Sequence, residues 1–226
     1  MNLRLLQLGD SALPIGGYSH SWGLEAAIER GQVRDAASLE RWVRFWLRFA
    51  VGPLEGVVLA HACRAAARGD FVGVRQANDL LRVTVTPPTL RHAARDMGEQ
   101  LLALAEGWPW AAASVAALRR VGDGPPRAWQ HAPVFGTLAA AASAQPRDAL
   151  LVYLHQAALG MIGAGVRAVP VGHTHGQQVL VHLQEDIETL ATELADRDLE
   201  SAGSGCPAYE VTCHVQTHLY TRLFRS

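Results

Sequence analysis

The chain has 226 residues, of which 49% are hydrophobic and 18% charged, and its formal net charge is −1. This balance argues against a nucleic-acid-binding protein, which usually presents a clustered basic face. All 20 basic residues are arginine, so a P-loop lysine, a Schiff-base lysine and a lysine general base are excluded, and any nucleotide hydrolysis belongs to another subunit.

The location of the protein is suggested by its apolar segments and its cysteines. The longest apolar stretch, from Ala149 to Val166, contains His155 and Gln156, which favours a buried helix over a membrane span. Three cysteines are an odd and sparse set that suits a reducing compartment. Residues 1–4 lead into a structured-looking segment without a signal-peptide pattern. We therefore expect a cytoplasmic protein that binds neither membrane nor nucleic acid.

The N-terminal region predicts a tight loop followed by a helix. Pro14 fixes its own φ, and Gly16 and Gly17 permit a positive φ, so these three residues are expected to shape the loop. Ser19 or Ser21 can then cap a helix through Leu24, Ala27 and Ile28.

Helical periodicity dominates the next part of the chain. Residues 36–51 place Leu39, Trp42, Val43, Trp46 and Phe49 on one face and Glu40, Arg44 and Arg48 on another. Gly52-Pro53 is expected to break this helix, with further helices over 54–68 and 72–82. Pro87-Pro88 starts the next one, which ends at Trp108-Pro109-Trp110.

The second half of the chain is also helical in pattern. We predict helices over 111–120, 135–144, 147–166 and 176–199, with a linker at 122–126. Thr174 and Gln177 fit a capping box for the last helix. Its leucine and isoleucine spacing, at alternate intervals of three and four, predicts a buried seam at Leu180, Leu183, Ile187, Leu190 and Leu194.

The overall prediction is an all-α fold. No convincing strand pattern or internal repeat occurs, so we expect residues 1–226 to form a single domain, a bundle of roughly eight to ten helices. Glycine and serine predict a flexible joint near 201–207, followed by a C-terminal tail over 208–226.

Histidines offer the only candidate metal ligands. His173 and His175 flank one residue before a predicted helix, while His214 and His218 share a helical face. A hydrolytic zinc site would need glutamate at position 215, where Val215 stands. Surface or interface histidines explain both pairs more simply, so no metal site is assigned.

Catalytic constellations are equally hard to find. Ser19 and Ser21 lie beside His20, but no nucleophile elbow surrounds them, and serines before a helix are usually caps. The tail is more informative, because Arg222 and Arg225 surround the apolar pair Leu223 and Phe224. Aromatic residues and arginines are enriched at protein interfaces. The sequence thus predicts a binding protein and no enzyme.

Three segments in the right order resemble the UreF-type urease accessory proteins. The first runs from Leu6 to Glu25 and includes Leu13-Pro14-Ile15-Gly16-Gly17-Tyr18-Ser19-His20-Ser21. The second extends from Pro133-Val134-Phe135-Gly136 through Val166–Gly172 to Gly176-Gln177, and the third is Tyr220-Thr221-Arg222-Leu223-Phe224-Arg225-Ser226. The similarity covers nearly the whole chain, although Gln216-Thr217 replace a usual His-Glu pair and His173 and His175 replace more usual glutamine and aspartate.

The resemblance implies a dimeric helical protein that assists nickel insertion into apo-urease. It would bind a UreD/UreH-type scaffold and the UreG GTPase, and it would hold no tight cofactor, since nickel is the cargo of the complex. By resemblance and residue type, Tyr220, Arg222, Leu223, Phe224 and Arg225 are expected to order on the UreD/UreH-type partner. The Pro14–Glu25 region, with Tyr18, His20 and Glu25, is expected near the UreG site and the dimer axis.

Two other functions stay open at this point. The protein could be a nickel-binding metallochaperone that uses His173, His175, His214 and His218. It could also regulate UreG, with Arg222 or Arg225 acting on the nucleotide as an arginine finger does.

Overall fold

A computed structural model describes residues 2–121 and 128–226, and these residues form helices joined by loops, without a strand among them. Ten of the helices in this part of the chain have ten or more residues. The all-α prediction is therefore confirmed. The linker predicted at 122–126 lies outside the described residues.

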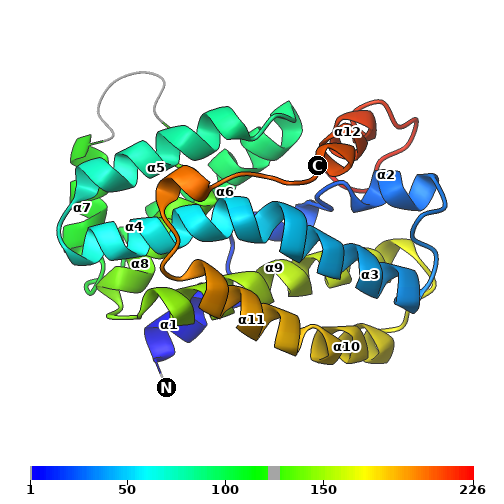
Figure 1. Ribbon diagram of the computed structural model, residues 1–226, viewed down its shortest axis with the longest axis horizontal. Coiled ribbons are helices and arrows are strands. Elements are labelled where there is room, and N and C mark those ends of the chain that lie inside the picture. Colours follow the sequence, from blue (N-terminus) through cyan, green and yellow to red (C-terminus); the bar gives the residue numbers. More distant parts are fainter. Residues whose placement is uncertain (1, 122–127) are drawn as a thin grey trace.

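Figure 1 shows how the helices are arranged along the chain. Their bounds are α1 Leu3–Leu8, α2 Leu24–Glu29, α3 Ala36–Trp46, α4 Val57–Ala67, α5 Phe71–Thr84, α6 Pro88–Ala105, α7 Ala112–Val121, α8 His131–Ala141, α9 Pro146–Ala168, α10 His173–His182, α11 Gln184–Leu194 and α12 Pro207–Gln216. A π-helical segment, Leu47–Gly56, joins α3 to α4, and 3-10 turns occur at Gly17–Ser19 and Leu199–Ser201.

The core lies where α4 packs against α5, α8 and α9. Figure 1 shows α3 and α4 as one long rod across the molecule, with α5 on one side and α11 on the other. A Cβ atom at Gly136 would lie 2.3 Å from the carbonyl oxygen of Leu59, so glycine is what lets α8 approach α4 so closely.

Helix α9 is the one helix in the described residues that is long and apolar enough to cross a membrane, and half of its apolar window is buried. It contacts α4, α8, α10 and α11. The buried-helix prediction for Ala149–Val166 is therefore consistent with this packing, which explains the apolar run without a bilayer.

The predicted break at Gly52-Pro53 is wrong. The chain passes through both residues as the π-helical segment, whose wider turn accommodates a proline that has no N–H to donate. A Cβ atom at Gly52 would lie 2.4 Å from the carbonyl oxygen of Leu47, which explains the glycine. The predicted face is only partly right, since Phe49 is half exposed while Leu39 and Trp46 are buried.

The segment predicted to be a flexible joint lies along this π-helical segment. The N–H of Gly203 donates to the Pro53 carbonyl (3.2 Å), and that of Gly205 donates to the Phe49 carbonyl (2.9 Å). Cys206 is buried directly after them. The segment 201–207 thus donates hydrogen bonds to two backbone carbonyl groups that would accept from within the helix if an α-helix continued there. The flexibility of this segment stays a prediction.

The single long helix predicted over 176–199 is wrong in two respects. The chain bends at Leu183, where α10 ends and α11 begins. The guanidinium of Arg44 stabilises this bend, because it donates to the His182 carbonyl (3.3 Å) and pairs with Asp186 (2.8 Å). The helix also starts earlier, at His173, with Gly172 at the N-cap in place of the predicted Thr174 capping box. The buried seam itself is confirmed, since all five of its residues are in the core.

Candidate partner-binding site

The loop before α2 depends on left-handed backbone conformations. Gly16 has φ +86° and Gly23 has φ +82°, a region that favours glycine, and Trp22 also has a positive φ of 53°. A Cβ atom at Gly23 would lie 2.6 Å from the Cys213 sulfur, so glycine also permits close contact with α12. The glycine, and neither Ser19 nor Ser21, stands at the N-cap of α2, which corrects the predicted cap.

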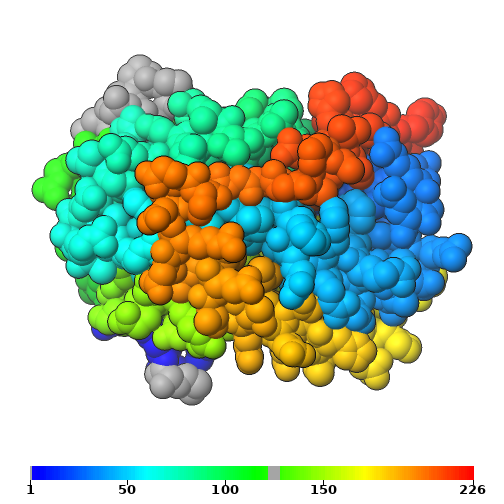
Figure 2. Space-filling view, in the orientation of Figure 1, coloured from blue at the N-terminus to red at the C-terminus, as the bar shows by residue number. Residues whose placement is uncertain are grey.

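The end of the chain folds back onto this loop. The carbonyl of Ser226 accepts hydrogen bonds from the N–H groups of Ser21 (2.5 Å) and Trp22 (3.1 Å), and the N–H of Arg225 donates to the Ser19 carbonyl (2.8 Å). The hydroxyl of Ser21, which the sequence suggested as a cap, donates to the Ser226 carbonyl (3.0 Å). The loop and the tail are therefore one structural unit (Figure 2, where the red C-terminal residues lie beside the blue residues around α2).

Glu25 also binds the tail, through its side-chain carboxylate. Its carboxylate accepts hydrogen bonds from the backbone N–H groups of Leu223 (2.6 Å) and Phe224 (3.3 Å). A carboxylate that accepts two backbone donors makes strong, charge-assisted hydrogen bonds. In the free chain, Glu25 therefore acts within the protein, whereas the sequence suggested a contact with a partner.

Arg167, from the last turn of α9, lies between two aromatic rings. Its guanidinium carbon lies 3.7 Å from the ring centroid of Tyr18 and 4.6 Å from that of Phe224, and it donates to the Tyr18 carbonyl (2.9 Å). Cation–π contacts of this kind stabilise by about 0.5–2 kcal/mol. Phe224 itself is buried. Arg167 thus links loop, tail and core.

His20 lies inside the same unit. It is only 7% exposed, and its Nδ1 lies 2.7 Å from the hydroxyl oxygen of Ser226. Burial lowers the pKa of His20, and the Arg225 guanidinium lowers it further, while the Asp96 carboxylate opposes the shift. His20 was predicted to contact a partner, but in the free chain its imidazole faces the tail.

Acidification is expected to weaken this unit through His20. Because the folded-state pKa lies below the unfolded value of about 6.5, the unfolded chain binds the proton more readily, so stability falls as pH falls through that window. Thermal unfolding between pH 7 and pH 5 should show a steeper loss of Tm for the native chain than for His20→Gln, which keeps a hydrogen-bonding group but does not titrate. Equal slopes for the two proteins would contradict this role.

What remains exposed is a surface of aromatic, aliphatic and arginine side chains. Tyr18 and Leu223 are each 75% exposed and Tyr220 is fully exposed, next to the exposed Arg222 and Arg225. We call this the loop–tail surface; its residues are Tyr18, Arg167, Tyr220, Arg222, Leu223 and Arg225. The predicted loop residues and tail residues, which are some 200 positions apart in sequence, therefore meet on one face.

Comparison with known proteins places the chain in a family. A family model described as UreF matches residues 33–184. A urease accessory protein UreF from Thermosynechococcus vestitus is 37% identical over 231 residues, covering 99% of this chain and 97% of the relative. The chain belongs to the UreF family. Its similarity to UreF proteins extends to Methylibium petroleiphilum (37% identity, 99% and 93% coverage) and Cupriavidus necator (36%, 99% and 97%). The predicted resemblance is confirmed.

The histidines of this UreF-family chain form no larger cluster. His173 and His175 are exposed in the first turn of α10, which corrects their predicted place in a loop. His214 and His218 are exposed with ring centroids 5.7 Å apart. Across residues 2–121 and 128–226, no group of three or more potential metal-ligating side chains comes together. The histidine pairs thus lie on separate elements.

Arg167 is the residue of this surface that the sequence reasoning missed. A signal existed, because Arg167 lies inside the Val166–Gly172 segment that resembles the UreF family. In the sequence, however, a single arginine at the end of an apolar helix is explained by its favourable interaction with the helix dipole at the C-terminus. Its stacking on residues from two distant segments follows only from the fold.

Proposed function

We propose that this chain is a non-catalytic urease maturation factor. In this proposal it bridges a UreD/UreH-type scaffold and the UreG GTPase while nickel is inserted into apo-urease. It acts in the cytoplasm as a homodimer and binds no cofactor tightly, because nickel is the cargo of the complex. Membership of the UreF family supports the proposal, as do relatives named urease accessory proteins.

The observation that carries the proposal is the loop–tail surface. Tyr18, Tyr220 and Leu223 expose large apolar areas on backbone that Ser19, Glu25 and their hydrogen bonds hold in place. Preorganised aromatic and arginine side chains are typical anchors of protein interfaces, because little conformational entropy is lost when they bind.

The composition of this surface indicates the chemistry of its partners. Arg222 and Arg225 are exposed, and the segment 217–226 contains no acidic residue. We assign the tail side chains to the UreD/UreH-type partner and Tyr18 to UreG, and we expect carboxylates around an apolar patch on the partner. The expectation that the tail orders only on its partner is corrected, because in the free chain its backbone is already hydrogen-bonded to Ser19 and Glu25. The tail therefore presents its side chains without a separate ordering step.

Co-purification tests this function. The chain is mixed with its cognate UreD/UreH-type protein and UreG, and the product is sized by light scattering. We expect one complex that contains all three proteins. A chain that recruits neither partner would contradict the bridging function.

The metallochaperone alternative rests on the His214–His218 pair, whose rings lie on one exposed face. Calorimetric titration of the isolated chain with Ni²⁺ separates the two functions. The bridging function predicts no tight stoichiometric binding, because two imidazoles leave most of a metal's coordination positions to water. Tight binding that His214→Ala abolishes would favour the metallochaperone.

The GTPase-regulator alternative rests on Arg222 and Arg225, both of which are exposed. Turnover of GTP by UreG is measured with and without the chain and its Arg222→Ala and Arg225→Ala variants. A rate increase that depends on one arginine would support a regulator.

A further inference from the structure

A cavity of about 650 Å³ runs along one face of α9, beneath the loop that carries Tyr18. Pockets that hold small organic molecules have volumes of about 300–1,000 Å³. The helix contributes residues spaced by three or four positions, namely Tyr153, Gln156, Gly160, Gly163 and Arg167. At a rise of about 1.5 Å per residue, the first and last of these lie about 21 Å apart along the helix axis. The cavity is therefore elongated, with Tyr153 at one end and the loop–tail surface at the other.

Glu55 is the acidic group at the Tyr153 end of the cavity. Its Oε2 accepts a hydrogen bond from the Tyr153 hydroxyl, while its Oε1 has no partner among the residues that the structure describes. This oxygen is open to the cavity, whereas the unpartnered Nε2 of His131 is sealed from it. Burial raises the pKa of Glu55, the hydrogen bond from Tyr153 opposes the shift, and no arginine in the described part of the chain contributes. The carboxyl group thus lacks a cationic partner.

Aromatic rings surround this carboxyl group. The rings of Trp22 and Trp46 are roughly parallel, with centroids 6.5 Å apart, and both residues line the cavity. The same two tryptophans and Glu55 also line a second pocket of about 30 Å³, so the three side chains are neighbours. The face of a tryptophan ring attracts cations. A carboxyl group beside such faces has the chemistry that recognises an organic ammonium ion.

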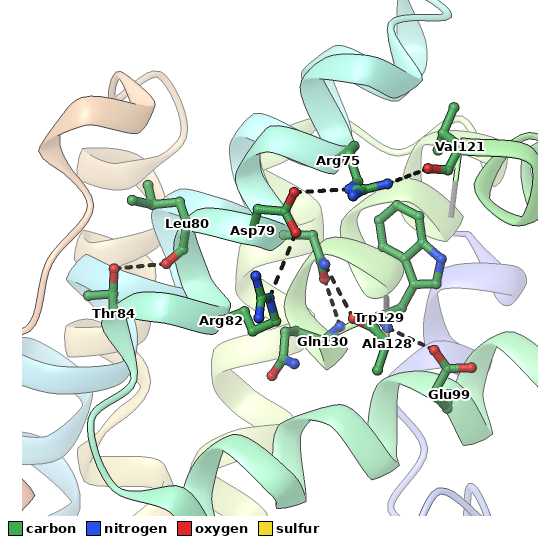
Figure 3. Close-up of polar contacts among 11 residues, drawn as sticks. Arg75, Asp79, Leu80, Arg82, Thr84, Glu99, Val121, Ala128, Trp129 and Gln130 are labelled. Atoms are coloured by element: carbon green, nitrogen blue, oxygen red, sulfur yellow. Dashed lines mark hydrogen bonds and ion pairs between the residues drawn. The ribbon is translucent and has the colours of Figure 1, made fainter. Parts of the chain in front are cut away.

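His131 adds an aromatic ring to this wall but no positive charge. Burial lowers the pKa of His131 to about 4, so the imidazole is neutral at pH 7. The segment before it is fixed, because the N–H of Gln130 donates to the Asn78 side chain (2.8 Å) and the N–H of Trp129 donates to Glu99 (2.7 Å) (Figure 3). The histidine is therefore held in the wall and neither repels a cation nor neutralises the carboxylate.

Arg167, the one arginine of the cavity wall, belongs to the far end. Its guanidinium donates to the carbonyl groups of Gly163 (3.0 Å) and Tyr18 (2.9 Å). Gly163 lies about 15 Å from Tyr153 along α9, which exceeds the Debye length of about 8 Å at physiological ionic strength. The charge of Arg167 therefore has little effect at the Glu55 end.

We infer that this cavity binds a small organic ammonium ion, with the ammonium group on Oε1 of Glu55 and an apolar body extending along α9. A metal ion fits less well, because it needs several ligands, and residues 2–121 and 128–226 bring no three potential ligating side chains together. Gly160 leaves room for the apolar body, since a Cβ atom there would meet no atom within 4 Å. The inference goes beyond the proposed function. Although the far end of the cavity adjoins the loop–tail surface, its test needs no partner protein.

Binding of phenethylammonium to the whole chain at pH 7 tests the inference, with 2-phenylethanol and 3-phenylpropionate as neutral and anionic analogues of similar shape. Ligand-observed NMR measures the three affinities. We expect saturable binding of phenethylammonium that is about tenfold tighter than that of 2-phenylethanol, as one charge-assisted hydrogen bond predicts. The anionic analogue should not bind, because Glu55 would repel it.

Two variants locate the site. Glu55→Gln keeps an oxygen that can accept from Tyr153 but carries no charge, so it should bring the affinities for phenethylammonium and 2-phenylethanol to within about twofold of each other. Glu188→Gln is the matched control, since Glu188 is exposed on α11 and should leave both affinities unchanged. Gly160→Phe should fill the cavity and abolish the binding of both ligands, which keeps the test decisive if Glu55→Gln does not fold.

Four results would overturn the inference. Phenethylammonium might fail to saturate the native chain, or 2-phenylethanol might bind it equally well. Tighter binding of 3-phenylpropionate would place the recognising charge at Arg167. A preference for phenethylammonium that survives in the Glu55→Gln variant would show that the ammonium group lies elsewhere.

Discussion

Replacing both Tyr220 and Leu223 with alanine is expected to weaken binding of the UreD/UreH-type partner about a hundredfold, or about 3 kcal/mol. Both side chains are exposed in the free chain, at 103% and 75% of their reference areas. Their truncation removes apolar anchors without opening a cavity, so the free energy of unfolding should change by about 0.5 kcal/mol or less. Affinity is measured by surface binding or calorimetry, and stability by thermal unfolding.

Leu3→Ala is the matched control for this variant. Leu3 is 72% exposed, almost the same fraction as Leu223, but it lies on α1, far from the C-terminal residues (Figure 1). The control should bind the partner with native affinity. If the Tyr220→Ala, Leu223→Ala variant bound the partner with native affinity, the tail would not be part of the interface.

The Phe224→Ala variant tests whether the buried aromatic residue of the tail has a different role from the exposed Tyr220 and Leu223. Phe224 is 5% exposed and contacts the Arg167 guanidinium, so its loss should free the tail from the loop. We expect this variant to lose both partner affinity and stability, in contrast to the pair of exposed substitutions, which should affect affinity alone.

Replacing Gly136 with alanine is expected to destabilise the chain by about 3 kcal/mol. The added Cβ atom would lie 2.3 Å from the Leu59 carbonyl oxygen and 3.2 Å from the Cys63 nitrogen, both backbone atoms of the central helix α4. Backbone cannot rotate away as a side chain can, so α8 must shift and the core must repack. Urea unfolding measures the loss, which should appear as a lower midpoint at an unchanged slope.

Gly160→Ala is expected to change the free energy of unfolding in the opposite direction. Gly160 lies within α9, and a Cβ atom there would meet no atom within 4 Å. Alanine lowers the entropy of the unfolded chain and suits a helix interior, so this variant should gain up to about 1 kcal/mol. Equal effects of the two substitutions would show that the close approach of α8 to α4 does not determine stability.

The wrongly predicted break at Gly52-Pro53 and the missed bend at Leu183 have a common cause. Gly52-Pro53 breaks an isolated α-helix, but here Gly203 and Gly205 bind carbonyls of the π-helical segment that replaces the break. Residues 176–199 read as one helix, but Arg44 binds the carbonyl and the carboxylate at the bend near Leu183. In both cases hydrogen bonds from a distant segment outweighed local propensity.

The helical class, the buried seam from Leu180 to Leu194 and the family follow from the amino-acid sequence, since apolar periodicity and ordered motifs are properties of the chain alone. It also pointed to both halves of the loop–tail surface. The folded chain was needed to show that these halves meet, that Glu25 and His20 bind the tail, and that His131 lines a cavity. The reason is that such contacts join residues some 50 to 200 positions apart, and their geometry depends on how whole helices pack.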